Sequence, residues 1–131
     1  MKTLPLCLAL CALALPAAAQ DTTPAALIAQ YEAAAGAKAD PAAGRDLFLA
    51  NHTGGKPDTP SCTTCHTNDP TKAGQARTGK VIDPLAPSVT PTRFTDSAKV
   101  EKWFGRNCDS VLGRACTDAE KADLIAWLSS L

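Results

Sequence analysis

Cys62-Thr63-Thr64-Cys65-His66 is the stretch that decides the fold of this 131-residue chain. Two thiols three residues apart, followed directly by an imidazole, have the C-x-x-C-H spacing of covalent haem attachment. The two thiols can bond to the two vinyl groups of one haem, while the adjacent imidazole ligates the iron. Because the motif occurs once, we expect one covalently bound haem c, held by Cys62, Cys65 and His66.

Two other kinds of site contain a similar pattern. A thioredoxin-like redox pair lies at the start of a helix in a βαβ unit, and the sequence shows no such unit. A structural zinc site needs four donors, and the only other histidine of the chain is His52. The motif therefore favours haem.

The segment around the motif is unusual for a small domain. Residues 51–92 are rich in Pro, Gly, Thr, Asp and Asn, with no sustained period of two or 3.6 residues. A loop of about 40 residues is too long for a self-sufficient compact domain. A large apolar cofactor would supply the core that these residues lack.

Four helices are predicted on either side of this segment. Capping residues, early prolines and apolar positions at helical spacing mark their ends and buried faces. No strand alternation and no internal repeat is visible, so the predicted class is all-α with long loops. The predicted helices are residues 24–35 before Gly36, 41–50 after Asp40, 96–107 with Val100, Trp103 and Phe104, and 117–131 after a capping box from Thr117 to Glu120.

The first 19 residues have the features of a signal peptide. Lys2 precedes an apolar run from Leu4 to Leu15, and small residues follow as far as Ala19. The run is shorter than the roughly 20 residues that span a bilayer, so no membrane anchor is expected. We predict cleavage after Ala19, export to the periplasm, and a single monohaem cytochrome c domain over residues 20–131.

Cleavage would change the inventory of charges and cysteines. It removes Lys2 and leaves 12 of the 13 basic residues against 13 acidic ones, so no overall field favours nucleic acid. The remaining cysteines enter an oxidising compartment, where thiols end as disulfides, metal ligands or thioethers. If Cys108 and Cys116 pair, they hold residues 107–116 beside the last helix.

The sixth iron ligand is the open question. The only methionine is Met1, which leaves with the signal peptide, so a His/Met cytochrome is excluded. The alternatives are His52, a weak donor such as Asn107, a lysine, or an open site. From the residues alone, His52 is more often a surface loop histidine, and Asn107 is more often a polar residue ending a helix.

Several stretches resemble the oxygen-binding class I cytochromes called sphaeroides haem protein (SHP). They are the CTTCH motif and residues 31–36, 54–61 and 105–108, which read YEAAAG, GGKPDTPS and GRNC. The resemblance implies a small class I cytochrome c fold, with helices packed around one haem. It also implies that His66 is the permanent ligand, that Asn107 is a distal ligand lost on reduction, and that Cys108 and Cys116 form a disulfide.

The expected function follows from this resemblance. It is a periplasmic cytochrome that accepts electrons, with a dihaem cytochrome c as donor, and binds small gaseous or anionic ligands such as oxygen and nitric oxide at ferrous haem. One alternative is a plain electron carrier with a permanent sixth ligand such as His52. Another is an enzyme that turns over oxygen, nitric oxide or nitrite, but no proton source is obvious, so a dedicated enzyme is less favoured.

A basic cluster accompanies the predicted third helix. Its members are Lys99, Lys102, Arg106 and Arg114. Such residues more often form a solvated helix face, and the alternative is a patch that docks an acidic redox partner.

Overall fold

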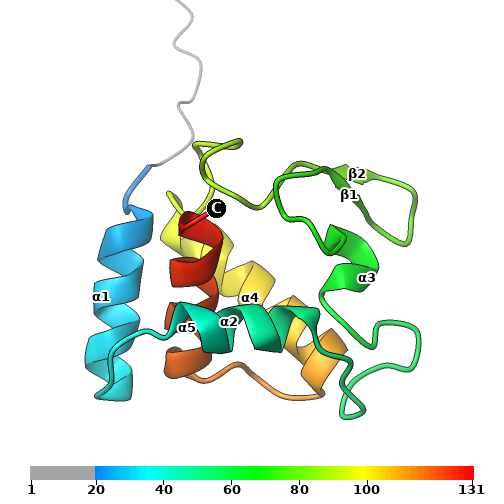
Figure 1. Ribbon diagram of the computed structural model, residues 1–131, viewed down its shortest axis with the longest axis horizontal. Coiled ribbons are helices and arrows are strands. Elements are labelled where there is room, and N and C mark those ends of the chain that lie inside the picture. Colours follow the sequence, from blue (N-terminus) through cyan, green and yellow to red (C-terminus); the bar gives the residue numbers. More distant parts are fainter. Residues whose placement is uncertain (1–19) are drawn as a thin grey trace, which may run out of the picture.

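Five helices and one small hairpin form the structure, a computed structural model that describes residues 20–131 (Figure 1). The predicted signal peptide, residues 1–19, lies outside the described residues. No helix among residues 20–131 is long and apolar enough to cross a membrane. The helices are α1 (Pro24–Ala35), α2 (Pro41–Leu49), α3 (Thr63–His66), α4 (Ser97–Leu112) and α5 (Asp118–Ser129), and the strands are β1 (Gly74–Gln75) and β2 (Val81–Ile82).

The caps confirm both predicted ends of α1 and the predicted start of α5, whereas α5 ends at Ser129 and not at residue 131. The Thr23 hydroxyl accepts a hydrogen bond from the amide of Ala26 at 3.1 Å, and Gly36 closes α1 in the left-handed conformation at φ 67°. At α5, Thr117 and Glu120 form both hydrogen bonds of the capping box. Such side chains satisfy the amides that a helix start leaves unpaired.

Two predictions about local structure were wrong. Helix α4 does not end at Asn107 but continues to Leu112, because Cys108 and Val111 extend its buried face. The segment 51–92 is not free of strands, since β1 and β2 pair antiparallel, with Gly74 opposite Ile82. These strands have two residues each, which is too short for an alternating pattern to appear in the sequence.

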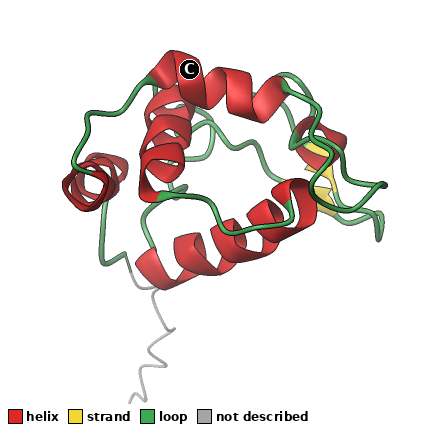
Figure 2. Ribbon diagram, turned by 90° about the horizontal axis from the view of Figure 1, so that it is seen from below, coloured by secondary structure: helices red, strands yellow, loops and turns green. Residues whose placement is uncertain are grey.

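Helix α5 forms the centre of the core. It packs against both α1 and α2, and Figure 2 shows α2 and α4 on opposite sides of it, with α3 and the hairpin at the far end. One buried cluster joins Leu27 and Tyr31 of α1 to Val100 of α4 and to Ala122 and Ile125 of α5. A second cluster joins Phe48 of α2 to Leu124, Trp127 and Leu128 of α5.

A polar network closes the first cluster. The Tyr31 hydroxyl donates to the Glu101 carboxylate, and the Lys121 ammonium lies 3.0 Å from that carboxylate and 5.0 Å from the centre of the Tyr31 ring. Burial and the adjacent Glu101 raise the pKa of Tyr31, so the phenol stays protonated as a donor. The network ties α1, α4 and α5 together.

The contact between α2 and α5 provides a test of the packing. A Cβ at the buried Gly44 would lie 2.2 Å from the Asp123 carbonyl oxygen, so Gly44→Ala must push the two helices apart. We expect the free energy of unfolding to fall by about 3 kcal/mol, measured by urea denaturation.

Gly105 in α4 is the matched control. A Cβ there meets nothing within 4 Å, so Gly105→Ala should stabilise the protein by up to about 1 kcal/mol. Equal effects of the two substitutions would contradict the close approach of α2 and α5.

Candidate haem site

Helix α3 brings the three residues of the motif onto a single turn. The amides of Cys65 and His66 lie 3.3 Å and 3.1 Å from the Cys62 carbonyl oxygen, to which they donate. All three side chains are half-buried. One turn thus presents two thiols and one imidazole next to a partly covered surface.

Contacts outside α3 fix this turn. The buried Ser61 hydroxyl donates to the Phe48 carbonyl at the end of α2 (3.2 Å) and accepts from the amide and hydroxyl of Thr63. On the other side, β1 approaches so closely that a Cβ on Gly74 would lie 2.0 Å from the Cys65 carbonyl oxygen. The turn is therefore held between α2 and the hairpin.

Burial sets the protonation of the motif residues. It raises the pKa of the Cys62 thiol to about 11, so this thiol is not a reactive thiolate of the kind that redox pairs use. Burial, with a smaller effect of the Arg93 charge, lowers the pKa of His66 to about 4. His66 is thus neutral at pH 7, and neutral imidazole is the form that ligates a metal.

The donors do not fit a zinc ion but do fit haem. Within residues 20–131, no three His, Cys, Asp or Glu side chains converge closely enough to hold a metal ion. Two separated thiols and an adjacent imidazole instead match the vinyl groups and the iron of one macrocycle. The neighbouring surface is apolar, as haem requires, and the ring centres of His66 and Phe48 lie 6.2 Å apart.

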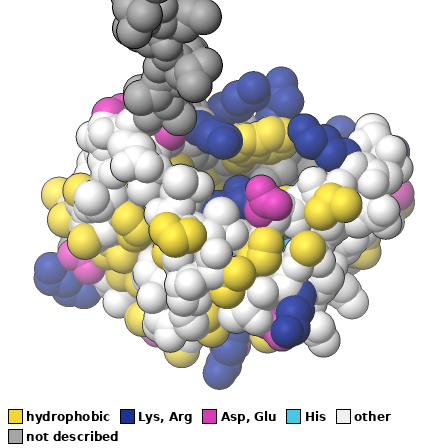
Figure 3. All heavy atoms as spheres, turned by 90° about the horizontal axis from the view of Figure 1, so that it is seen from above, with side chains coloured by type: hydrophobic (Ala, Val, Ile, Leu, Met, Phe, Trp, Pro, Cys, Tyr) yellow, Lys and Arg dark blue, Asp and Glu magenta, His cyan; other side chains and the backbone are white. Residues whose placement is uncertain are grey.

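Half-buried apolar side chains continue this surface from several elements. Seen from above, the molecule has a hollow with hydrophobic side chains in it and Lys, Arg and acidic side chains beside it (Figure 3). The side chains that pack against the Phe48 cluster here are Leu47, Cys62, Leu85, Phe94 and Phe104.

Asn107 lies on the inner face of α4. It follows Val100 by seven residues and Phe104 by three, and it precedes Val111 by four, which places all four on one face of the helix. Val100 and Val111 are buried and Phe104 is half-buried, yet Asn107 is exposed. A polar side chain thus occupies an exposed place on the otherwise apolar face of the helix.

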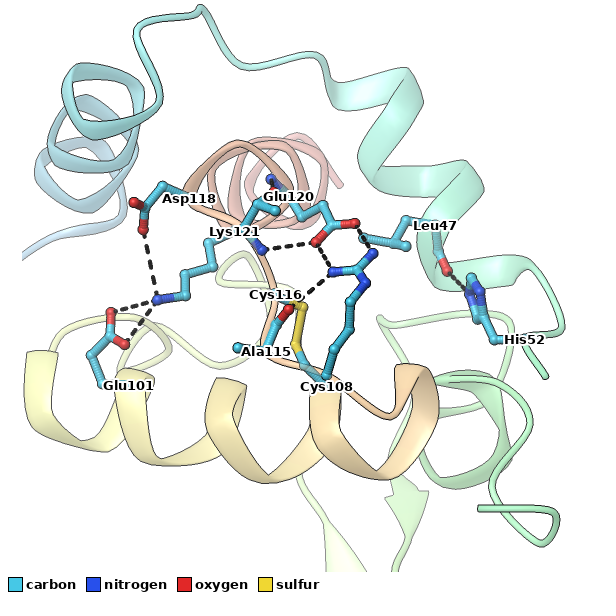
Figure 4. The surroundings of a disulfide bond; sticks show 11 residues. Leu47, His52, Glu101, Cys108, Ala115, Cys116, Asp118, Glu120 and Lys121 are labelled. Atoms are coloured by element: carbon cyan, nitrogen blue, oxygen red, sulfur yellow. Dashed lines mark hydrogen bonds and ion pairs between the residues drawn. A yellow bond between two sulfur atoms is a disulfide. The ribbon is translucent and has the colours of Figure 1, made fainter. Parts of the chain in front are cut away.

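A disulfide secures the chain next to Asn107. Cys108 and Cys116 form it, with both residues buried and their Cα atoms 5.6 Å apart. Figure 4 shows it joining α4 to the segment that enters α5. Arg114 reinforces the same connection with two hydrogen bonds to the Glu120 carboxylate, at 2.7 Å and 2.8 Å.

The loop that carries residues 54–60 docks on the last turns of α4. The Lys56 amide donates to the Ser110 carbonyl oxygen at 2.7 Å, and the Thr59 hydroxyl binds both that oxygen and the Ser110 hydroxyl. The loop and the disulfide therefore hold the backbone of α4 just after Asn107.

His52 has a structural contact of its own. Its Nε2 lies 2.9 Å from the Leu47 carbonyl oxygen (Figure 4), and its amide donates to the Pro60 carbonyl oxygen at 2.7 Å. The imidazole thus secures the end of α2.

Arg93 is a residue of the site that the sequence analysis missed. It is half-buried, and its guanidinium donates to the carbonyl oxygens of Pro84 (3.0 Å) and Asp83 (2.5 Å). Its charge acts on His66. No motif marks this arginine, because only the course of the loop brings it near α3.

Comparison with known proteins gives strong matches over most of the chain. A family model described as a domain of unknown function (DUF1924) matches residues 34–128. The cytochrome c-type protein SHP of Cereibacter sphaeroides is 72% identical over 118 residues, covering 90% of this chain and 92% of SHP. The chain belongs to the SHP family of c-type cytochromes. Its cofactor is therefore covalently bound haem c.

Solved structures confirm the predicted small class I cytochrome c fold for this SHP family member. The structure of oxidised SHP, described as an oxygen-binding cytochrome c, matches with a TM-score of 0.83 and 72% identity, covering 85% of this chain and 99% of SHP. Oxidised cytochrome c'' of Methylophilus methylotrophus matches with a TM-score of 0.70 and 35% identity, covering 82% and 93%. The solution structure of cytochrome c'' concerns haem-ligand detachment.

The hydrogen bond of His52 to Leu47 leads to a prediction that tests whether His52 or Asn107 is the distal ligand. His52→Ala removes one hydrogen bond and should lower the free energy of unfolding by about 1 kcal/mol. If the imidazole has only this structural role, the haem absorption spectrum should stay the same in both oxidation states. Loss of the low-spin spectrum in both states would instead identify His52 as a permanent sixth ligand.

Proposed function

We propose that the chain is a periplasmic haem protein that accepts an electron and then binds oxygen or nitric oxide at the ferrous haem, after Asn107 has left the iron. A dihaem cytochrome c is the proposed electron donor. Membership of the SHP family supports this function, since oxidised SHP is described as an oxygen-binding cytochrome c. Other small gaseous or anionic ligands would use the same position.

In this proposal Cys62 and Cys65 hold the haem by thioether bonds, and His66 is the proximal ligand. The clamp that Ser61 and β1 place on α3 supports a permanent role for His66, because the imidazole cannot move far without breaking these contacts. Its depressed pKa favours the same role, since the ring remains a neutral donor.

The observation that carries the proposal is the place of Asn107 on α4. Its amide lies on the apolar inner face, in line with Phe104 and Val111, and no other described segment covers it. Because the side chain is exposed, its amide oxygen is accessible to a haem iron placed against this face. The second candidate, His52, is already bonded to the Leu47 carbonyl oxygen.

The choice of Asn as ligand explains why it would leave. The haem iron, when bound, would supply a redox centre that protein donors or small molecules can ligate. A neutral amide oxygen is a hard donor, better suited to ferric than to the softer ferrous state. Asn107 would therefore hold the distal position in the oxidised protein and release it on reduction.

Mass spectrometry can test which cysteines attach the haem. Cys62→Ala and Cys65→Ala should each leave one thioether bond, and the double variant should have none. The double variant should lose its haem on extraction with acidified acetone, whereas Cys108→Ser with Cys116→Ser should retain it. Mass spectrometry of the extracted chains measures this, and a double variant that keeps covalent haem would disprove the assignment.

The distal ligand can be tested by spectroscopy. The ferrous protein should bind carbon monoxide with a clear change in its absorption spectrum. Asn107→Ala should shift the ferric spectrum toward high spin and leave the ferrous carbon monoxide complex unchanged, because Asn107 is a ligand only in the ferric state. Asn51→Ala, at another exposed asparagine, is the control. A ferrous low-spin spectrum unaffected by carbon monoxide would rule out the open site.

A further inference from the structure

One flank of α4 carries a stripe of three cations and one tryptophan. Lys99, Lys102, Trp103 and Arg106 are spaced i, i+3, i+4 and i+7, which aligns them along one side of the helix. All four side chains are exposed. Trp103 is 45% exposed, which is unusual for the largest apolar side chain.

The cations of this stripe have no acidic partners among residues 20–131. The ion pairs of the described part use other basic residues, and Arg114, which the sequence grouped with this cluster, is paired with Glu120. The two neighbours of Trp103 instead flank its ring, with Lys102 Nζ at 5.7 Å and Arg106 Cζ at 5.5 Å from the ring centre. Their charge is therefore available to another molecule.

The position of the stripe relates it to the haem site. Trp103 precedes Asn107 by four residues, so the two lie one helical turn apart on α4. After removal of residues 1–19 the chain has one more acidic than basic residue. The positive character is therefore local to this edge.

We propose that Lys99, Lys102, Trp103 and Arg106 form the docking surface for the electron donor, a redox protein with an acidic surface around its own cofactor. This proposal rests on the proposed function, because it assumes that a protein reduces the haem. Opposite charges steer such partners together, while tryptophan and arginine are the residues that most often carry binding energy at interfaces. The apolar ring flanked by cations supplies both contributions.

The test uses the ferric holoprotein and two reductants of opposite charge. Flavodoxin hydroquinone serves as an acidic protein donor, and hexaammineruthenium(II) serves as a small cation. In stopped-flow measurements at low ionic strength, Lys102→Glu with Arg106→Glu should slow reduction by flavodoxin at least about tenfold. Added salt should lower the rate of reduction by flavodoxin in the unsubstituted protein but not in this variant. Reduction by the ruthenium complex should not slow.

Matched variants separate the stripe from a general change of charge. Lys72→Glu with Lys80→Glu makes the same change in net charge at two exposed loop positions. This variant should slow the reduction of the haem by flavodoxin much less. Trp103→Ala should slow the reduction by flavodoxin at both high and low salt, because it removes an apolar contact. Val89→Ala, at another exposed apolar residue, should leave this rate unchanged.

Two outcomes would overturn the docking surface. One is an equal effect of the two charge reversals, and the other is an unchanged flavodoxin rate in the Lys102→Glu, Arg106→Glu variant. Binding of that stripe to phosphatidylglycerol vesicles, with unchanged flavodoxin kinetics, would assign it to a lipid surface instead. Carbon monoxide binding after reduction with dithionite tests the proposed function separately, because it needs no docking.

Discussion

The clamp on α3 is the constraint on which the rest of the structure depends. A helix of four residues cannot be stable on its own, since nucleation of a single turn is unfavourable. The turn exists because Ser61 bonds it to the end of α2 and because β1 lies against its backbone at Gly74. The placement of Cys62, Cys65 and His66 is therefore a tertiary property, determined by α2 and the hairpin.

The two sides of the haem site are built from different kinds of structure. On the side of the motif, a loop that includes the short helix α3 carries Cys62, Cys65 and His66. Contacts of this loop with α2 fix its conformation. In the proposed function the opposite side is α4, a helix of 16 residues whose inner face packs on α1 and α5 through Val100 and Phe104. A long helix fixes the backbone at Asn107 more firmly than a loop would, because each of its turns is bonded to the next.

The sequence predicted those features that have local causes. Thr23 and Thr117 mark helix starts because their hydroxyls cap nearby amides, and the C-x-x-C-H spacing identified the haem motif. The end of α4 was predicted too early, because a polar Asn107 interrupts the apolar pattern that continues through Val111. Distant contacts could not be predicted at all, since the bond from Ser61 to Phe48 spans 13 residues and depends on how the loop folds back.

A releasable ligand requires a side chain that moves while its backbone stays. The disulfide at Cys108 and the hydrogen bonds at Ser110 restrain α4 just beyond Asn107, so the helix itself has little freedom to shift. The exposed side chain of Asn107 retains its rotations, and rotamer changes of exposed side chains take picoseconds to nanoseconds. In the proposed function, the restraints on the helix thus confine ligand release to the turning of one amide, which needs no refolding of the protein around it.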